Sequence, residues 1–256
     1  MIHLERLDHI AIIRIDRPER LNCFDYPTLV ELKELVATVR REPDIRVVLF
    51  TGTGKAFSAG ADLKERVTLN ETEVRRNVEM IRDVFEDIAR LPQPTIAAVN
   101  GHALGGGFEW MLACDFRMIV DGALVGLTET SFGIIPGAGG TQRLPRLIGE
   151  TRAKELIFTA KKIDAKTAEQ YGIVSRVVPT VEELMEVCLA FADEMLRNGP
   201  IAIRQAKQAI DRGLDQTLSE GLKLETAAYE TVIPTEDRLE ALRAFAEKRR
   251  PQFQGK

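Results

Sequence analysis

The sequence predicts an α/β fold, with a mixed α/β core over residues 1–195 and a helical C-terminal subdomain over residues 196–256. Three observations support this division. Short β-branched runs alternate with amphipathic helical patterns as far as residue 178. Only helical patterns follow Thr180. The 256 residues are 45% hydrophobic and 29% charged, the balance of a globular chain long enough to bury a sizeable core.

The first elements are two strands, a loop and a helix. Residues 2–7 partly alternate between apolar and polar side chains, and residues 9–15 are mostly β-branched, so both segments predict strands. Residues 16–20 contain Pro18 and predict a loop. The helix that follows has Pro27 near its start and apolar residues at helical spacing, namely Leu29, Leu32, Leu35, Val36 and Val39.

A buried strand, a second helix and another strand come next. Residues 46–51 form an apolar run that ends at a Gly-Thr-Gly sequence. Asn70 precedes an amphipathic helix, and Glu73 stands at the spacing of a capping box. The apolar stripe of this helix consists of Val74, Val78, Ile81, Val84, Phe85 and Ile88. Residues 94–99 predict the next strand.

The middle of the chain is rich in glycine, and the last part is helical. Residues 101–107 and 133–140 hold four glycines each, with strands predicted at 116–120 and 123–127 between them. Residues 173–178 predict the last strand. Thr180 and Glu183 indicate a capped helix, and further helices are predicted near 200–213, 216–230 and 235–247.

Charge and composition exclude several classes of protein. The 35 Lys and Arg residues against 39 Asp and Glu residues give a net charge of −4, which argues against a basic nucleic-acid binder or a membrane-surface protein. Three dispersed cysteines and three histidines predict neither a disulfide framework nor a zinc site. The chain shows no targeting pattern and no apolar run of about 18 residues, so we expect no membrane partner and a cytoplasmic location.

Two nucleotide-binding motifs and one hydrolase motif are incomplete or absent. The sequence Gly-Thr-Gly-Lys at 52–55 is followed by Ala56, where a P-loop requires a hydroxyl residue. Gly137 and Gly139 begin a dinucleotide-binding pattern, but Gln142 stands at its last glycine position. No Gly-X-Ser-X-Gly nucleophile elbow is present.

One glycine run is a candidate catalytic segment. Gly105, Gly106 and Gly107 precede a helical pattern, so the Gly106 N–H lies near a helix N-terminus and could form half of an oxyanion hole. Glu109 lies one helical turn further on the same face. Alternatively, Glu109 is an exposed glutamate that the helix dipole favours in a first turn.

Glu129 is a second candidate, 20 positions after Glu109 in an apolar, small-residue segment. A carboxyl group in such surroundings is expected to have a raised pKa, and two glutamates in different environments can act as an acid and a base. The alternative is that these are two unrelated acids among the 39 in the chain.

Over nearly its whole length the chain resembles the enoyl-CoA hydratase/isomerase (crotonase) superfamily. The motifs that support this are KAFSAGADLK at 55–64, GHALGGGFE at 101–109, IPGAGGTQRL at 135–144 and AFAEKR at 244–249. The resemblance implies a crotonase-like spiral of ββα turns with two near-perpendicular sheets, followed by a C-terminal helical trimerisation region.

The resemblance also implies roles for individual residues. The oxyanion-hole donors correspond to Ala61 and Gly106, and the two hydratase glutamates to Glu109 and Glu129. The residues that contact coenzyme A correspond to Arg20, Leu21, Ala59, Ala61, Asp62, Leu63, Lys64, Gly106, Phe245 and Lys248. Coenzyme A is part of the substrate, and no separate cofactor or metal is implied.

The resemblance favours one activity and leaves others open. Both glutamates are retained, which favours a hydratase of a short or branched 2-enoyl-CoA, and several runs look most like 3-methylglutaconyl-CoA hydratases. Trp110 is bulkier than usual beside Glu109, and with Phe108 it could change the acyl pocket. An isomerase is the alternative enzyme. An RNA-binding role is disfavoured, because the helix at 29–41 mixes acids with bases.

The family also implies an assembly. The C-terminal apolar stripe of Leu218, Leu222, Thr226 and Tyr229 must be buried somewhere, either on the chain's own core or against another copy. We expect a homo-oligomer, a hexamer built as a dimer of trimers, with an acyl-CoA substrate as the small-molecule partner.

Overall fold

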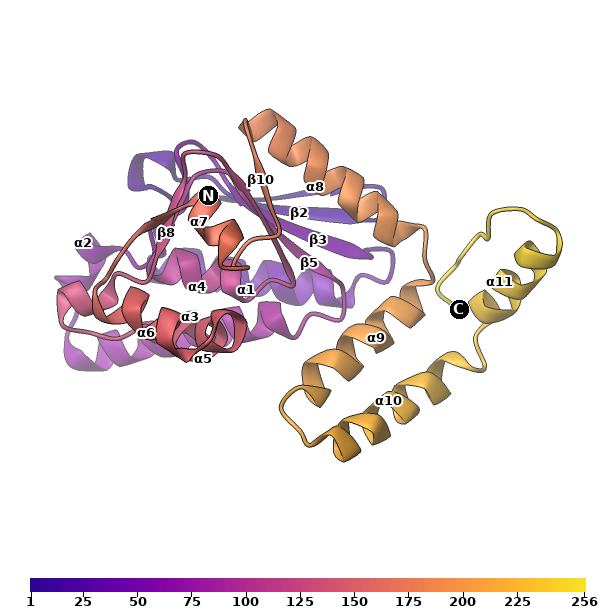
Figure 1. Cartoon of the computed structure of the whole chain (residues 1–256). Helices are drawn as coiled ribbons and strands as arrows, with labels where there is room; N and C mark the ends of the chain where they lie inside the picture. Colours follow the sequence, from indigo (N-terminus) through magenta and orange to yellow (C-terminus); the bar gives the residue numbers. More distant parts are fainter. The chain divides into compact units, whose positions relative to one another are not determined.

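The computed structural model describes all of residues 1–256, which form two compact units (Figure 1). The first unit contains residues 1–91 and 95–189, and the second contains residues 92–94 and 190–256. None of the helices combines the length and the apolar character that crossing a lipid bilayer requires.

A six-stranded sheet is the centre of the first unit. Its strands, in spatial order, are β1 (Ile2–Leu7), β2 (Ile10–Ile15), β3 (Val47–Gly52), β5 (Thr95–Val99), β7 (Phe116–Val120) and β10 (Arg176–Val178). β1 and β2 form an antiparallel hairpin, and all the other neighbours are parallel. Every residue of β3 and β5 is buried, which explains why these strands are continuous apolar runs rather than alternating ones.

Helices cover the sheet, and their caps agree with the sequence. On one face, α1 (Tyr26–Arg41) and α3 (Glu71–Ala89) pack against each other and join a common core with Ile13, Phe50 and Val99. Asn70 and Glu73 form the predicted capping box at the start of α3. On the other face, Cys188 of α8 (Val181–Leu196) lies 3.6 Å from the Met118 sulfur of β7.

A second, four-stranded sheet is formed by short strands, most of which come directly after a strand of the large sheet in the chain. It contains β4 (Ala56–Ser58), β6 (His102–Leu104), β8 (Leu124–Gly126) and β9 (Ile163–Asp164) in that order. Each of β4, β6 and β8 follows a strand of the large sheet, so the chain repeats a two-strand step three times in succession. This repetition brings the loops after β4, β6 and β8 together, and these loops contain the candidate site residues.

Short elements connect the strands of the first unit. They are η1 (Pro18–Arg20), α2 (Leu63–Arg66), α4 (Gly106–Leu112), η2 (Glu129–Phe132), α5 (Gly140–Ile148), α6 (Glu150–Phe158) and α7 (Ala165–Gln170). Of these, α2, α4 and η2 hold candidate site residues at or beside their first residue.

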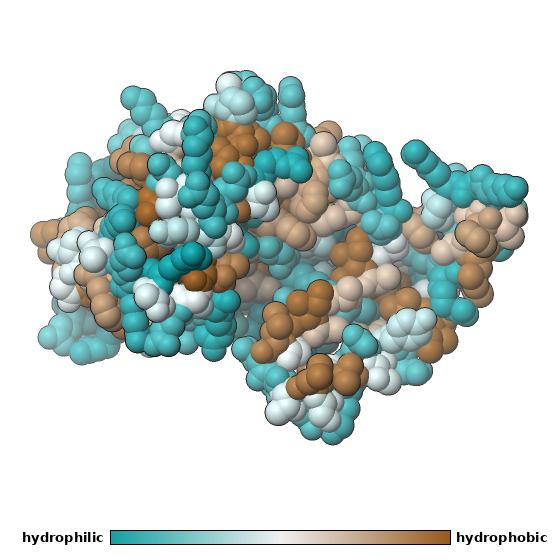
Figure 2. All heavy atoms as spheres, viewed as in Figure 1, coloured by the Kyte–Doolittle hydropathy of each residue, from teal (hydrophilic) through white to brown (hydrophobic).

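The second unit is helical, as the sequence predicts. α9 (Pro200–Gly213) and α10 (Leu218–Val232) form a helical hairpin, and α11 (Glu236–Ala246) follows. The Asp237 carboxylate accepts hydrogen bonds from the N–H groups of Gln254 and Gly255, at 2.6 and 2.8 Å, which fastens the last residues to α11. Figure 2 shows apolar side chains on the surface of α9, α10 and the turn between them; the exposed ones include Ile210, Leu214, Leu218, Leu222 and Tyr229.

Candidate active site

Gly60 brings two backbone segments into direct contact. Its φ of +89° is a conformation that side chains disfavour. A Cβ atom at this position would lie 2.8 Å from the Gly106 nitrogen and 2.9 Å from the Leu104 carbonyl oxygen. The Ala61 nitrogen, one residue on, lies 3.7 Å from where a Cβ on Gly106 would stand. The structure therefore brings the predicted pair of amide donors together, although they are far apart in the sequence.

The N–H groups of Ala61 and Gly106 are both available for a ligand. Phe24 pairs with the Ala61 strand segment in parallel, donating to the Gly60 carbonyl and accepting from the Asp62 N–H. In such a ladder the N–H of the intervening residue points away from the partner. Gly106 is the first residue of α4, where backbone N–H groups have no acceptor within the helix. Neither N–H donates to an acceptor within the chain.

Glu109 is held by two backbone amides. Its side chain is buried, with 3% of the residue exposed. Its Oε1 accepts hydrogen bonds from the N–H groups of Ala138 and Gly140, both at 2.8 Å. Burial has the largest effect and raises the pKa of the Glu109 carboxyl above its ordinary value, while these two hydrogen bonds and the positive charge of Arg143 partly oppose that rise. The alternative of an exposed first-turn glutamate is wrong.

Glu129 has a different environment. It begins η2, its Oε2 is buried without a hydrogen-bond partner, and its Oε1 lies 3.4 Å from where a Cβ on Gly105 would stand. Burial, with the nearby charge of Glu109, raises the pKa of this carboxyl to about 7. Glu129 therefore has a proton to give near neutral pH, and it stands beside the glycine that precedes the Gly106 N–H.

This arrangement combines repeated two-strand steps, a pair of adjacent amide donors, a buried glutamate and a second, partly buried one. Together these features are typical of the crotonase class of enzymes, which act on acyl thioesters of coenzyme A.

Comparison with known proteins agrees with this class. The family model described as enoyl-CoA hydratase/isomerase matches residues 5–256, and the chain belongs to that family. The crystal structure of an enoyl-CoA hydratase from Bacillus anthracis superposes with a TM-score of 0.97, at 51% identity over 100% of this chain and 99% of that one. YngF of Bacillus subtilis is 48% identical over 97% of this chain and 95% of its own length. Human mitochondrial methylglutaconyl-CoA hydratase is 44% identical over 99% of this chain and 76% of its own length.

The residues predicted to contact coenzyme A fall into two groups. Those of the first unit are Arg20, Leu21, residues of the 59–64 segment and Gly106. The first two segments are adjacent, because the Ala59 N–H donates to the Leu21 carbonyl at 3.0 Å, and Gly106 lies beside Gly60 and Ala61. Leu21 and Leu63 are exposed, whereas Asp62 is buried. Phe245 and Lys248 belong to the second unit, where Phe245 is exposed on α11. Their contact with coenzyme A stays a prediction.

Trp110 is a core residue. It has no exposed surface, and its ring stacks on Phe57 with the ring centres 4.1 Å apart. Phe24 and Phe50 pack edge-on against it. Phe108 is also fully buried. The Trp110 side chain thus packs in the aromatic core, and its effect on the acyl pocket, like that of Phe108, stays a prediction.

Sequence reasoning missed the partners of Glu109. The glycine-rich segment at 133–140 contains Ala138 and Gly140, whose N–H groups orient the Glu109 carboxylate. A Cβ on Gly140 would come within 3.0 Å of the Glu109 Oε1, so glycine is needed here for close approach. The high glycine content of this segment indicates a close approach of the backbone, but it does not identify the side chain that is approached.

Proposed function

We propose that the protein is a hydratase that adds water across the double bond of a short or branched 2-enoyl-CoA thioester. The main support is one observation: the buried Glu109 and the partly buried Glu129, in different environments, stand beside two free backbone N–H groups. Attack of water at Cβ drives negative charge onto the thioester oxygen, and the N–H groups of Ala61 and Gly106 stabilise that enolate. One such donor typically contributes about 3–4 kcal/mol to the transition state.

The two glutamates take opposite roles in this proposal. Glu109 is the base, because two N–H donors favour its ionised form, and it accepts a proton as the water oxygen bonds to Cβ. Glu129 is the acid, because it keeps a proton up to a pKa of about 7, and it gives that proton to Cα. The enolate electron pair takes up this proton as the carbonyl re-forms, and proton exchange with solvent then restores both carboxyl groups.

The acyl chain is proposed from the resemblance. The human relative is named methylglutaconyl-CoA hydratase, which supports 3-methylglutaconyl-CoA as a candidate substrate. The nucleotide and pantetheine parts would lie against Arg20, Leu21 and residues 59–64, with Phe245 and Lys248 closing the site. In this proposal coenzyme A is part of the substrate, and the reaction needs no separate cofactor. The three cysteines are free thiols, which supports a reducing location such as the cytoplasm.

The test compares Glu109→Gln and Glu129→Gln with Glu182→Gln, a change at an exposed glutamate on α8. Hydration of crotonyl-CoA and 3-methylglutaconyl-CoA is followed by loss of the conjugated-enoyl absorbance. Each site variant should lose at least about a hundredfold in kcat, with coenzyme A affinity retained, and the control should match wild type. Near-normal hydration by either site variant would overturn the proposal.

A second incubation distinguishes the hydratase from the isomerase that the family also includes. The wild-type protein is given a 3-enoyl-CoA or a 2-enoyl-CoA in water enriched in ¹⁸O. A hydratase incorporates the heavy oxygen into product from the 2-enoyl-CoA. Migration of the double bond of the 3-enoyl-CoA without incorporation from either substrate would assign an isomerase instead.

A further inference from the structure

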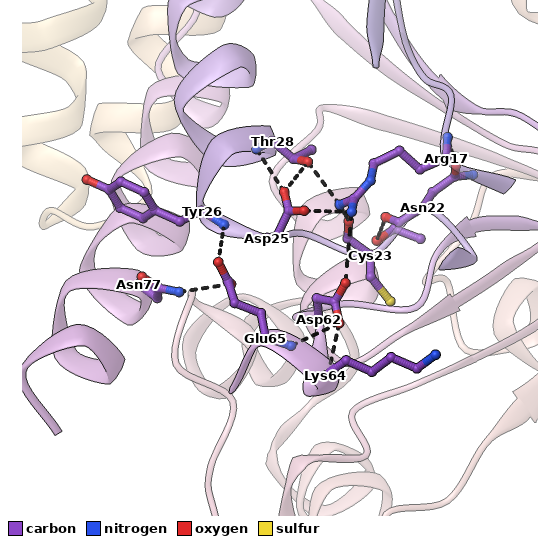
Figure 3. A network of polar contacts seen from close by, with 11 residues as sticks. Arg17, Asn22, Cys23, Asp25, Tyr26, Thr28, Asp62, Lys64, Glu65 and Asn77 are labelled. Atoms are coloured by element: carbon purple, nitrogen blue, oxygen red, sulfur yellow. Dashed lines mark hydrogen bonds and ion pairs between the residues drawn. The ribbon is translucent and has the colours of Figure 1, made fainter. Parts of the chain in front are cut away.

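Arg17, Asp25 and Asp62 form a largely buried ionic cluster (Figure 3), and Asp62 directly follows Ala61 in the chain. Arg17 has 7% of its surface exposed. Its Nη2 lies 2.6 Å from an Asp25 carboxylate oxygen and 3.9 Å from an Asp62 carboxylate oxygen. Its Nη1 donates to the Cys23 carbonyl at 2.7 Å and to the Thr28 hydroxyl at 3.0 Å. One guanidinium group therefore fixes several points of the 23–28 segment.

The two chain positions that Arg17 binds flank Phe24. Arg17 binds the carbonyl of Cys23 on one side and the carboxylate of Asp25 on the other. Between them, the Phe24 N–H donates to the Gly60 carbonyl at 2.8 Å, and the Phe24 carbonyl accepts from the Asp62 N–H at 2.9 Å. Because Arg17 holds the residues on both sides of Phe24, it also holds the position from which Phe24 makes these two hydrogen bonds.

The Gly60 carbonyl and the Ala61 N–H belong to the same peptide unit. Because that unit is planar, a hydrogen bond that fixes the carbonyl direction also fixes the opposite direction of the N–H. A hydrogen bond accepted by the carbonyl also polarises the N–H as a donor. Phe24 therefore sets both the aim and the strength of the Ala61 N–H.

Asp62 follows Ala61, and its side chain is held at both carboxylate oxygens. Its Oδ1 accepts from the N–H groups of Lys64 and Glu65, at 2.9 and 3.3 Å, and caps α2. Its Oδ2 is the oxygen that faces Arg17. Ala61 thus lies between two positions tied to the same guanidinium group, while Arg17 has no role in the proposed chemistry.

We propose that Arg17 is a positioning residue that aims the Ala61 N–H at the thioester oxygen through Phe24 and Asp62. The proposal rests on the oxyanion role of Ala61 in the proposed function. A buried ion pair is weak evidence for stability but can specify one geometry. The cluster places one cation against two carboxylates and leaves the buried Arg17 Nε without a partner, a poor design for stability alone.

The experiment measures how strongly the protein hydrogen-bonds the thioester carbonyl of a bound ligand. Butyryl-CoA with a ¹³C-labelled thioester carbonyl is bound to the protein, and its stretching band is recorded by infrared difference spectroscopy. This saturated thioester cannot be hydrated, and hydrogen bonding to its oxygen moves the band to lower frequency. Wild type should show that shift, and Arg17→Met should lose a large part of it.

Kinetics on the same variants separate positioning from structure. The enolate exists only after substrate has bound, so Arg17→Met should lower kcat for crotonyl-CoA by about thirtyfold or more while KM changes by less than about threefold. Arg17→Lys keeps the charge but not the fork of donors and should fall between Met and wild type. Asp25→Asn keeps the cap of α1 but weakens the ion pair with Arg17. It therefore tests the effect of Arg17 on the Ala61 N–H if Arg17→Met does not fold.

The matched control is Arg117→Met. Arg117 is a partly buried arginine that donates to the carbonyls of Ile173 and Cys114, away from the Ala61 segment. It should lose stability but keep the wild-type carbonyl band. The inference is overturned if Arg17→Met and Asp25→Asn keep the full band shift, or if their kcat falls no further than in the control. Absence of the shift in wild type would instead overturn the oxyanion role of Ala61.

Discussion

Two glutamates of the same chemical type have been given different proton affinities by their neighbours. Glu109 accepts two N–H groups on one oxygen, whereas Glu129 has an oxygen that is buried with no partner. Hydrogen bonds to a carboxylate favour its ionised form, and burial without them favours the neutral form. In the proposed reaction, this difference lets one carboxyl group accept a proton while the other donates one at the same pH.

The pH dependence of turnover follows from the environment of Glu129. Its pKa is about 7, and the proposed reaction requires its protonated form. We expect kcat/KM for crotonyl-CoA to fall about tenfold per pH unit well above pH 7. A decline at low pH should follow as Glu109 becomes protonated. The residual activity of Glu129→Gln should lack the decline at high pH, and a flat wild-type profile up to pH 9 would contradict the acid role.

The same group makes a prediction about stability. The pKa of the Glu129 carboxyl rises from an ordinary 4.5 to about 7 on folding, so the folded state holds this proton more tightly than the unfolded state. Glu129 therefore contributes nothing below pH 4.5, increasingly destabilises the fold between pH 4.5 and 7, and has a constant cost above pH 7. Glu129→Gln should be more stable than wild type at pH 8, by up to about 3 kcal/mol.

Urea unfolding of both proteins at pH 4.5 and pH 8 measures that difference. The two free energies of unfolding should be close to each other at the lower pH. A gap of the same size at both pH values would show that the buried charge of Glu129 is not its cause.

The sequence predicts those site residues that are related by local spacing, but not those that only the folded chain brings together. Gly106 and Glu109 lie within one helical turn, so local spacing is enough to relate them. The partners that orient Glu109 come from residues 138 and 140, and the link from Arg17 to Ala61 passes through Phe24. These contacts exist only after the sheets have formed, and no local pattern encodes them.

Among the elements, length limited what the sequence could predict, although β8 and β10, with three residues each, lie within strands that were predicted from longer apolar runs. Strands of five or six residues in the large sheet appear as apolar runs, and the capping box of α3 has a fixed spacing, so both were predicted and are confirmed. β4, β6 and β9 have only two or three residues. So few residues cannot display a period, and pairing between distant segments stabilises these strands instead.

Gly60, in the loop after β4, allows this loop to contact the start of α4. Gly60→Ala places a methyl group 2.8 Å from the Gly106 nitrogen at a positive φ, so it should displace both amide donors and abolish most of the activity. Gly122→Ala is the matched control, since its φ is +80° and no atom lies within 4 Å of the added methyl. The control should lose about 1 kcal/mol of stability and keep its activity.

Activity assays and urea unfolding on the two purified variants are sufficient. If Gly60→Ala turned over crotonyl-CoA as fast as Gly122→Ala does, close approach at Gly60 would not matter for catalysis.

At the scale of the whole molecule, the fold class was predicted and is confirmed, while the assembly stays a proposal. The α/β part and the helical end follow from a change in hydrophobic period along the chain. The apolar residues Leu218, Leu222 and Tyr229 of α10 are 80%, 51% and 67% exposed in a single chain. We propose that copies of this chain cover them in a homo-oligomer, a trimer or a dimer of trimers.

Light scattering at micromolar concentration tests the assembly. The measured mass should be three or six times the 28.6 kDa of one chain. Leu218→Lys together with Leu222→Lys should lower the mass, because charges would replace apolar contacts. Leu7→Lys, at an exposed position on β1, should leave it unchanged. A mass near 28.6 kDa for the wild-type protein would refute the proposal.

Removal of the residues after Thr235 tests whether the C-terminal end also contacts the substrate. This truncation deletes Phe245 and Lys248, and we expect weaker coenzyme A binding by calorimetry. Unchanged affinity would show that α11 takes no part in the site.

The contact at Gly60 has a consequence for how this scaffold could be given new reactions. The groups proposed to stabilise the enolate are main-chain N–H groups, which every residue except proline supplies. Their function therefore depends on the path of the chain and hardly at all on side-chain identity at those positions. Proton transfer, by contrast, is assigned to side chains at 109 and 129 alone. Residues 109 and 129 could therefore be redesigned for other proton transfers while the main-chain donors stay in place, provided that the residue at 109 still accepts hydrogen bonds from Ala138 and Gly140.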